Sequence, residues 1–213
     1  MPHTAVVLSL AILTAGSVAA GDQEGSTAAA IAARFDKIYS GPSTLFSPAP
    51  NAFLTRMLNG VKPGRALDVA MGQGRNAVYL AKQGWEVTGY DISETGLDAA
   101  RAAAQKAGVR IECFRGSHQD FDFGRDRWDL IVMTYTLADM EDASFLRRIR
   151  ESLKSGGIVV VEQMNAGGTG KGPANALFRS FQDLRIIHYE DVVDTAEWSL
   201  QKMRIGRIVA QRD

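Results

Sequence analysis

From residue 65 onward, short apolar runs alternate with stretches of helical pattern. The runs have the length and composition of buried strands, and the stretches between them have those of short helices. Alternation of this kind predicts an α/β fold, in which helices cover both faces of a doubly wound, mostly parallel sheet. The predicted strands are residues 66–70, 85–90, 109–114, 128–133 and 157–163, and the predicted helices between them are residues 76–83, 94–107 and 142–153.

Glycines mark the ends of the predicted helices. Glycine is favoured just after a helix because it readily adopts the left-handed conformation that closes the last turn. We therefore expect the three helices to stop at Gly84, Gly108 and Gly156. Near the C-terminus, residues 184–196 and 203–211 are β-rich and joined by a short polar turn, which predicts an antiparallel hairpin at one edge of the sheet.

The region before the sheet has two parts. Residues 35–50 mix aromatic side chains with glycine and proline, which favours an irregular strap that serves as a lid. Asn51 then fits the N-cap of a helix over residues 52–58, and Gly60 fits its end.

The first twenty residues differ from the rest of the chain. Residues 5–20 carry no charge, and the small residues 18–20 precede Gly21, as at a secretory cleavage site. Residues 1–4 lack Lys and Arg, however, and the apolar stretch is short for a span of roughly 20 residues. We interpret the segment as a signal peptide, with an uncleaved membrane anchor, a packed helix or a wrongly assigned start codon as alternatives. The chain then divides into this segment (1–20), an N-terminal lid and helix (21–64) and the main domain (65–213).

Charge and cysteine content argue against two classes of function. The 213 residues include 24 Lys plus Arg and 24 Asp plus Glu, so the chain lacks the basic balance of a nucleic-acid-binding domain. One cysteine and three histidines cannot assemble a tetrahedral Cys/His zinc cluster. We therefore expect no nucleic-acid partner and no metal.

The turn after the first predicted strand has the features of a ligand cradle. Asp68 lies near the end of that strand, and Gly72 and Gly74 open the following helix. Glycines let the backbone approach a cofactor closely, and ligands of open α/β sheets bind beyond the carboxyl ends of the strands. Asp91, at the end of the second strand, is placed to accept hydrogen bonds from ribose hydroxyls. The alternatives are a tight turn that holds nothing, and an Asp91 or Ser93 that only caps the next helix.

The charge beside this turn favours one kind of cofactor. A pyrophosphate prefers backbone N–H groups without a neighbouring anion, so Asp68 disfavours a dinucleotide. Position 77 is Ala, a tolerated variant of the third glycine in the dinucleotide motif. S-adenosylmethionine (SAM) carries an ammonium and a sulfonium group, which suit an adjacent carboxylate. We therefore expect SAM, with an NAD-dependent dehydrogenase as the lesser alternative.

Four motifs occur in order along the chain, ALDVAMGQGRN, GYDIS, WDLIVMTY and LKSGGIVVVE. On these motifs the chain resembles the class I SAM-dependent methyltransferases from about residue 65 to its end. The phrases GRNAVYLAKQGWEVTGYDIS and YEDVVDTAEW are especially similar to the small tellurite-resistance and thiopurine-methyltransferase-like branch. The resemblance implies a Rossmann-like, seven-stranded sheet, SAM as the methyl donor and S-adenosylhomocysteine (SAH) as the product.

Carried over residue by residue, the resemblance implies a set of cofactor contacts. Asp68 matches the acid of the first motif, Asp91 the ribose acid and Ile92 the apolar residue against adenine. Ala70 stands in place of the first glycine, which is tolerable if its φ is negative. The full set of expected contacts is Asp68, Ala70, Met71, Gly72, Gly74, Asn76, Asp91, Ile92, Ser117, His118 and Thr134.

Recognition of adenine departs from the family pattern. Family members usually have an acid in the turn after the third strand, where this chain has Ser117. A hydroxyl, an imidazole and a carboxylate all offer an acceptor, so Ser117, His118 or Asp120 could take that role. A solvated turn residue is the alternative for His118.

Methyl transfer from a sulfonium is an in-line displacement, in which the protein mainly holds the nucleophile against the methyl group and excludes water. A general base is therefore optional. Tyr135, just beyond the fourth strand, is the expected catalytic residue, and a tyrosine that only packs the lid is the alternative. The expected substrate pocket consists of Tyr39, Phe46, Phe53, Tyr135 and Arg179, beside the glycine-rich insert 165–172 with Lys171, although core packing or solvation also accounts for these residues.

Together these features predict a SAM-dependent methyltransferase that acts on O, N, S or a metalloid oxyanion of a small molecule. The alternative is a non-catalytic binding module with the same fold, motivated by Ala70, Ser117 and the export-like segment. The compartment stays open, because SAM is made in the cytoplasm whereas residues 5–20 have the pattern of an export signal or of a segment that associates with a membrane.

Overall fold

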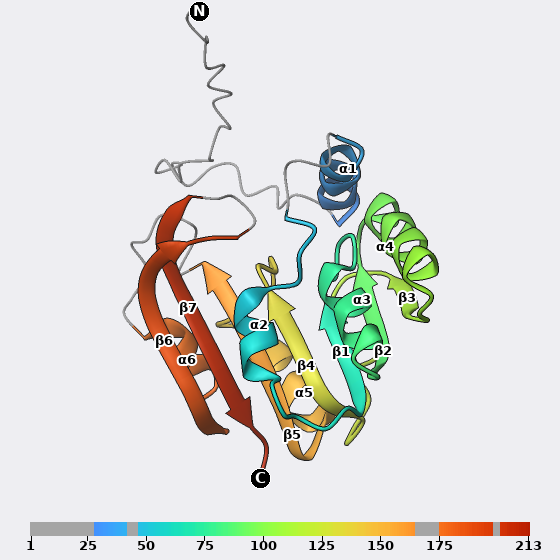
Figure 1. Cartoon of the computed structure of the whole chain (residues 1–213). Coiled ribbons are helices and arrows are strands. Elements are labelled where there is room, and N and C mark those ends of the chain that lie inside the picture. Colours follow the sequence, from blue (N-terminus) through green and yellow to red (C-terminus); the bar gives the residue numbers. More distant parts are fainter. Residues whose placement is uncertain (1–27, 42–46, 165–174, 198–200) are drawn as a thin grey trace, which may run out of the picture.

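A computed structural model describes residues 28–41, 47–164, 175–197 and 201–213 of the chain, which form a seven-stranded sheet of order β3-β2-β1-β4-β5-β7-β6 (Figure 1). The first five strands are mutually parallel, and β7 is antiparallel to both β5 and β6. This confirms the predicted α/β class, with the C-terminal hairpin at one edge. The strands are β1 (Arg65–Val69), β2 (Glu86–Asp91), β3 (Glu112–Arg115), β4 (Trp128–Thr134), β5 (Leu153–Met164), β6 (Arg185–Thr195) and β7 (Lys202–Gln211).

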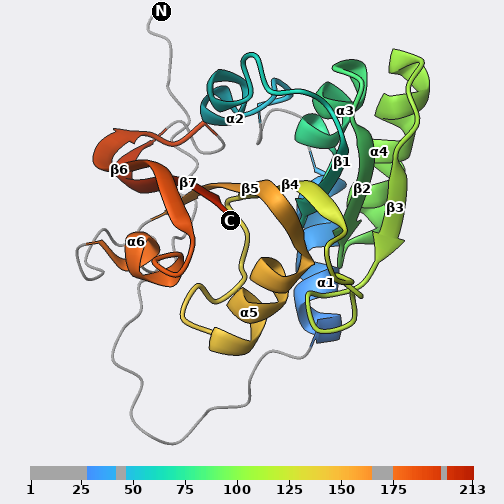
Figure 2. The same cartoon turned by 90° about the horizontal axis from the view of Figure 1, so that it is seen from below.

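Helices cover both faces of this sheet (Figure 2). On one face lie α2 (Ala52–Met57), α3 (Arg75–Lys82) and α4 (Glu94–Ala107), whose apolar side chains form one core with the sheet. On the other face lie α5 (Ala143–Ser152) and α6 (Ala176–Ser180), which belong to a second core. Burial on both faces explains why the central strands consist almost entirely of apolar residues.

Helix α1 (Ala28–Tyr39) takes a different position, beyond the carboxyl ends of the strands and against α4 (Figure 1). The predicted irregular strap was therefore wrong for residues 35–39, which complete this helix. The alanine-rich run before them has high helix propensity, and Phe35 and Tyr39, four residues apart, pair on one side with ring centroids 5.9 Å apart.

Most predicted element boundaries agree with the structure to within a few residues, and α4 has the predicted bounds. Gly84 and Gly108 follow α3 and α4 with positive φ, as expected. Gly156 was assigned wrongly, because α5 ends at Ser152 and Gly156 (φ 76°) lies inside β5, where the pairing with β4 is irregular. Its N–H donates to the carbonyl of Arg212 at 2.8 Å, so its left-handed backbone joins β5 to the residue that follows β7.

Two predicted segments lie wholly or mostly outside the described residues. The segment 1–20 is one of them, and the glycine-rich insert 165–172 is the other. Across the described ranges, none of the helices combines the length and the apolar character that crossing a bilayer requires.

Candidate functional site

A cavity of about 370 Å³ lies at the carboxyl ends of the central strands, beneath α1. Helix α1 contributes Ile31, Phe35 and Tyr39 to its wall. The rest of the wall comes from the ends of β1 and β2 and from the turns after β3 and β4, including Ala70, Asp91, Ile92, Ser117, His118 and Tyr135. The cavity thus brings together side chains from the predicted cofactor and catalytic sets.

Asp91 of the cavity wall is bonded to Gly72 in the glycine-rich turn. The N–H of Gly72 donates to Oδ2 of Asp91 at 2.8 Å, and the N–H of Ser93 donates to Oδ1 at the same distance. Gly72 has φ 52°, and a Cβ there would lie only 2.6 Å from the hydroxyl of Tyr39. Glycine is therefore needed for the left-handed backbone and for the close approach of α1.

The buried Asp91 lines the cavity and is not the N-cap of α4. Ser93 is the N-cap of that helix, and its hydroxyl accepts the N–H of Gly96 at 3.1 Å. Burial raises the pKa of Asp91, and its backbone hydrogen bonds oppose this shift. A carboxylate has about four lone-pair sites, so these backbone bonds leave capacity for a ligand in the cavity.

Gly74 and Met71 pack against neighbouring elements and do not line the cavity. Gly74 is the N-cap of α3 with φ 75°, and a Cβ there would lie 2.7 Å from the Cβ of Ala100 in α4. The Met71 side chain lies against Gly89 and Gly74 in the core. The φ of Ala70 is 53°, so the condition under which alanine is readily tolerated here, a negative φ, is not met. This exposed alanine therefore retains the backbone conformation that favours glycine.

Asp68 lies directly behind the cavity wall. It is 2% exposed, the backbone N–H of Ala77 in α3 is bonded to it, and Oδ2 has no hydrogen-bond partner among the described residues. Burial raises the pKa of Asp68 to about 7, against the opposing effects of Arg75 and the Ala77 N–H. A cationic ligand in the cavity would favour the ionised carboxylate.

The turn after β3 presents Ser117, His118 and Gln119 to the cavity. Asp120 is hydrogen-bonded within the turn. Its Oδ2 accepts the hydroxyl of Ser117 at 2.7 Å and the backbone N–H of Ser117 at 3.0 Å. Desolvation lowers the pKa of His118, which favours the neutral imidazole. His118 and Gln119 are thus the side chains of this turn that face the cavity and are not hydrogen-bonded to Asp120.

Asn76 and Thr134, both expected as cofactor contacts, bind each other. The amide of Asn76 donates to the hydroxyl of Thr134 at 2.9 Å, and its Oδ1 accepts the N–H of Asn51 at the same distance. Neither residue lines the cavity. Their contacts fasten the start of α2 to the end of β4.

The expected substrate residues are dispersed. Tyr39 and Tyr135 line the cavity, whereas Phe53 is 2% exposed within the core below α2. Arg179 is exposed on α6 and is not part of the cavity wall. Phe46 and Lys171 lie outside the described residues.

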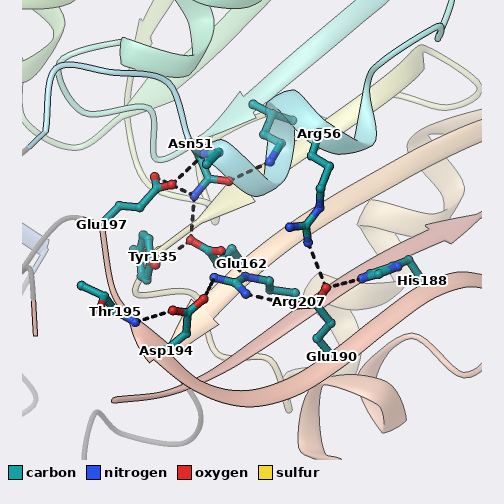
Figure 3. A network of polar contacts seen from close by, with 12 residues as sticks. Asn51, Arg56, Tyr135, Glu162, His188, Glu190, Asp194, Thr195, Glu197 and Arg207 are labelled. Carbon is teal, nitrogen blue, oxygen red and sulfur yellow. Dashed lines mark hydrogen bonds and ion pairs between the residues drawn. The ribbon is translucent and has the colours of Figure 1, made fainter. Parts of the chain in front are cut away.

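A polar network next to the cavity was not predicted (Figure 3). Glu162 of β5 is fully buried, and its Oε1 accepts the Tyr135 hydroxyl at 2.5 Å and the Asn51 amide at 2.6 Å. Its Oε2 accepts Nε of Arg207 at 2.5 Å. Arg207 also contacts Glu190 at 3.0 Å and Asp194 at 2.7 Å.

Part of the chain matches a known sequence family. Residues 66–157 match a sequence family described as "Methyltransferase domain". The ubiquinone biosynthesis O-methyltransferase of Azorhizobium caulinodans is 29% identical over 111 residues, which are 52% of this chain and 44% of that protein. An uncharacterized methyltransferase of Synechocystis sp. is 29% identical over 155 residues, 71% of this chain and 67% of that protein.

A solved structure shares the fold. TehB from Haemophilus influenzae superposes with a TM-score of 0.65 and 19% sequence identity over 85% of this chain and 67% of that chain. The present chain spans less than half of the length of the ubiquinone biosynthesis enzyme. The matched residues 66–157 nevertheless include the glycine-rich turn, Asp91 and Tyr135, and this match confirms the resemblance to the class I SAM-dependent methyltransferases.

Proposed function

We propose that the chain binds SAM in the cavity beneath α1 and promotes transfer of its methyl group to a small-molecule nucleophile. The observation that carries this proposal is the buried Asp91, which is bonded to the glycine-rich turn and faces the cavity. In this proposal residues 21–64 supply the lid, and residues 65–213 form the methyltransferase domain.

The residues present fit this cofactor. Asp91 can accept the ribose hydroxyls, and Ile92 offers an apolar contact for the adenine. The unpartnered Oδ2 of Asp68 places negative charge behind the turn, where an ammonium or sulfonium group would offset it. We assign the adenine edge to the turn at Ser117 and His118, where other family members have an acid.

The bound cofactor would supply an electrophilic methyl group on a positively charged sulfur. The chain itself contributes position and exclusion of water. Helix α1 covers the cavity with Ile31, Phe35 and Tyr39, and Asp36 fixes this helix by accepting the Ser93 hydroxyl at 2.5 Å and the Thr95 N–H at 3.1 Å. The lid is thus attached directly to the start of α4.

For the acceptor we favour a small molecule with a hydroxyl group. The named function of the Azorhizobium relative is O-methyl transfer. Tyr135, at the end of β4, lines the cavity on the side of the polar network. We assign the contact with the acceptor to this residue.

Calorimetry with SAM and with SAH on the full chain tests the cofactor. Binding of both is expected, and binding of neither would refute the proposal. A second experiment incubates the protein with methyl-labelled SAM and a panel of phenols, alcohols, thiols, amines and oxyanions. Labelled product from a hydroxyl compound is expected, whereas SAM binding without transfer to any compound would favour the non-catalytic binding module.

A further inference from the structure

Glu162 is a buried carboxylate that binding of SAM does not require. It belongs to β5, is 0% exposed and does not line the cavity. A buried carboxylate is costly unless it is paired and hydrogen-bonded. Its partners are one guanidinium, one amide and the hydroxyl of Tyr135, and only Tyr135 among them also reaches the cavity.

We propose that Tyr135 and Glu162 form a proton relay that receives the proton of a hydroxyl-bearing acceptor. Tyr135 is the group that touches the acceptor, and Glu162 acts through it. This inference rests on the proposed methyl transfer and adds to it the chemical class of the acceptor and the destination of its proton.

The hydrogen bonds of the Tyr135 hydroxyl have the direction that a relay needs. The hydroxyl donates to Oε1 of Glu162 at 2.5 Å, so its own proton already faces the carboxylate. The N–H of Glu197 donates to the phenolic oxygen, and a hydroxyl oxygen can accept two hydrogen bonds. The same oxygen therefore has the capacity to accept a bond from an acceptor O–H.

Tyr135 is also held rigidly. Its φ is 54°, which is costly for a residue other than glycine, and its N–H donates to the carbonyl of Glu162 at 2.9 Å. Burial, and after it the Glu162 carboxylate, raise the pKa of the Tyr135 phenol, so the phenol rests in its protonated form. Two contacts to one residue thus fix the ring at the end of β4.

Charged side chains from several elements surround Glu162. On the β6 and β7 side lie Arg207, Glu190 and Asp194, and His188 is bonded to Glu190 at 2.7 Å. The remaining charged members of the network come from α2, α3 and the turn after β6, and they are Arg56, Arg75 and Glu197. The network thus holds four carboxylates and three guanidinium groups.

A proton on Glu162 would leave three carboxylates with the three guanidinium groups of this network. Arg207 would keep Glu190 and Asp194 as partners, so it would not be left as an unpaired buried cation.

The step conserves atoms and charge. The acceptor oxygen forms a bond to the methyl carbon while the carbon–sulfur bond breaks, and the electron pair of that bond stays on sulfur. The proton of the acceptor moves to the Tyr135 oxygen as the original Tyr135 proton moves to Oε1 of Glu162. Tyr135 ends as a neutral phenol, and Glu162 returns its proton to water by the same route after the products leave.

The test uses 4-nitrophenol as the probe, because its phenolate absorbs visible light and its phenol does not. The full chain is loaded with SAH, and the absorbance of the bound probe is followed across pH. We expect the acid dissociation constant of the bound probe to rise at least tenfold over that of the free probe. Tyr135→Phe and Glu162→Gln should each remove this increase while SAH affinity, measured by calorimetry, stays within about twofold.

Controls separate the relay from general effects on the fold. Arg185→Ala, an exposed residue of β6, should keep the increase. Should Glu162→Gln fail to fold, Tyr135→Phe alone decides, because it retains the bonds of Glu162 to Asn51 and Arg207.

The relay is wrong if the wild-type protein binds SAH but not 4-nitrophenol, or binds 4-nitrophenol as the neutral phenol, or if both variants retain the increase. Absence of SAM and SAH binding would instead overturn the proposed function itself.

Discussion

Asp91, in the cavity wall, and Glu162, behind Tyr135, are held in different ways. We call the surroundings of Asp91 the cofactor end, and those of Tyr135 and Glu162 the acceptor end. At the cofactor end, Asp91 is bonded to backbone N–H groups, those of Gly72 and Ser93. At the other end, Glu162 is bonded to the side chains of Asn51, Tyr135 and Arg207. The first arrangement depends on the turns after two neighbouring strands, whereas the second depends on three elements that lie far apart in the sequence.

This difference has a functional consequence. Backbone N–H groups hold Asp91 in a fixed position and use only part of its capacity to accept hydrogen bonds. This acid therefore suits a ligand that always binds in the same orientation. Side-chain donors tie Glu162 to the packing of α2, β5 and β7. The cofactor end should therefore tolerate changes in the hairpin, and the acceptor end should not.

Loss of the guanidinium at Arg207 should have the largest effect. Arg207→Ala leaves the buried Glu162 without its cationic partner, for which about 3–5 kcal/mol of unfolding free energy is typical. Urea denaturation measures this loss. Arg185→Ala, in an exposed pair on β6, should cost about 0–1 kcal/mol. Equal effects of the two substitutions would remove the contrast between a buried and an exposed arginine.

The acceptor end could not be predicted for a physical reason. Glu162 ends an apolar run and Arg207 lies in an alternating one, so each has the pattern of a solvent-facing residue. Only the register of the sheet, which pairs Glu162 with Arg207 and Glu190 with Arg207, places them together under α2. The cofactor end was predictable because strand, turn and helix follow one another between residues 65 and 107.

The lid shows a second limit of the sequence. Tyr39 was expected in the pocket, and the structure places it in the cavity wall. The helix that carries it was missed, because the prolines and glycine after it dominated the interpretation of the whole segment. The contact of Asp36 with Ser93 and Thr95 had no local signal, since these residues are more than fifty positions apart.

Asp68, which lies behind the cofactor end, should make the free energy of unfolding depend on pH. The folded pKa of Asp68 is about 7, above its ordinary value of 3.8, so its protonated form stabilises the fold. This contribution is complete below about pH 4 and is lost as the pH rises through 7, at most roughly 4 kcal/mol. Urea denaturation from about pH 4 to pH 8 should show that loss in the wild-type protein and not in Asp68→Asn. Parallel pH curves for the two proteins would contradict the burial of an unpaired acid there.

Substitution of Gly74 should separate packing from backbone strain at the cofactor end. Gly74→Ala combines a positive φ with a Cβ 2.7 Å from Ala100, whereas Gly108→Ala has a positive φ and open space. We expect about 2–4 kcal/mol of destabilisation for Gly74→Ala and about 1 kcal/mol for Gly108→Ala, both by thermal or urea unfolding. Similar losses in both would show that α3 and α4 can move apart.

Removal of Asp91 should weaken SAM binding more than it weakens the fold. Each charge-assisted hydrogen bond to a ribose hydroxyl is worth roughly 1.5–3 kcal/mol, so Asp91→Ala should lower SAM affinity at least tenfold in calorimetry. Asp98→Ala, on the exposed side of α4, is the matched control and should leave affinity unchanged. A folded Asp91→Ala protein with wild-type affinity would reduce Asp91 to a partner of the Gly72 and Ser93 N–H groups.

The smallest effect is expected at the lid. Asp36 accepts two hydrogen bonds from the start of α4, and hydrogen bonding to Ser93 lowers its pKa, so it is ionised near neutral pH. Asp36→Ala removes these contacts but keeps Tyr39 and Phe35 against the cavity, and SAM affinity should fall about three- to tenfold. Lys37→Ala, the exposed neighbour on the same helix, should bind SAM as the wild-type protein does. Because the polar network lies outside α1, Asp36→Ala should leave the ionisation of bound 4-nitrophenol unchanged. If Asp36→Ala changed both the SAM affinity and the ionisation of bound 4-nitrophenol, the lid and the acceptor end would move together. The cofactor end and the acceptor end would then be coupled instead of separate.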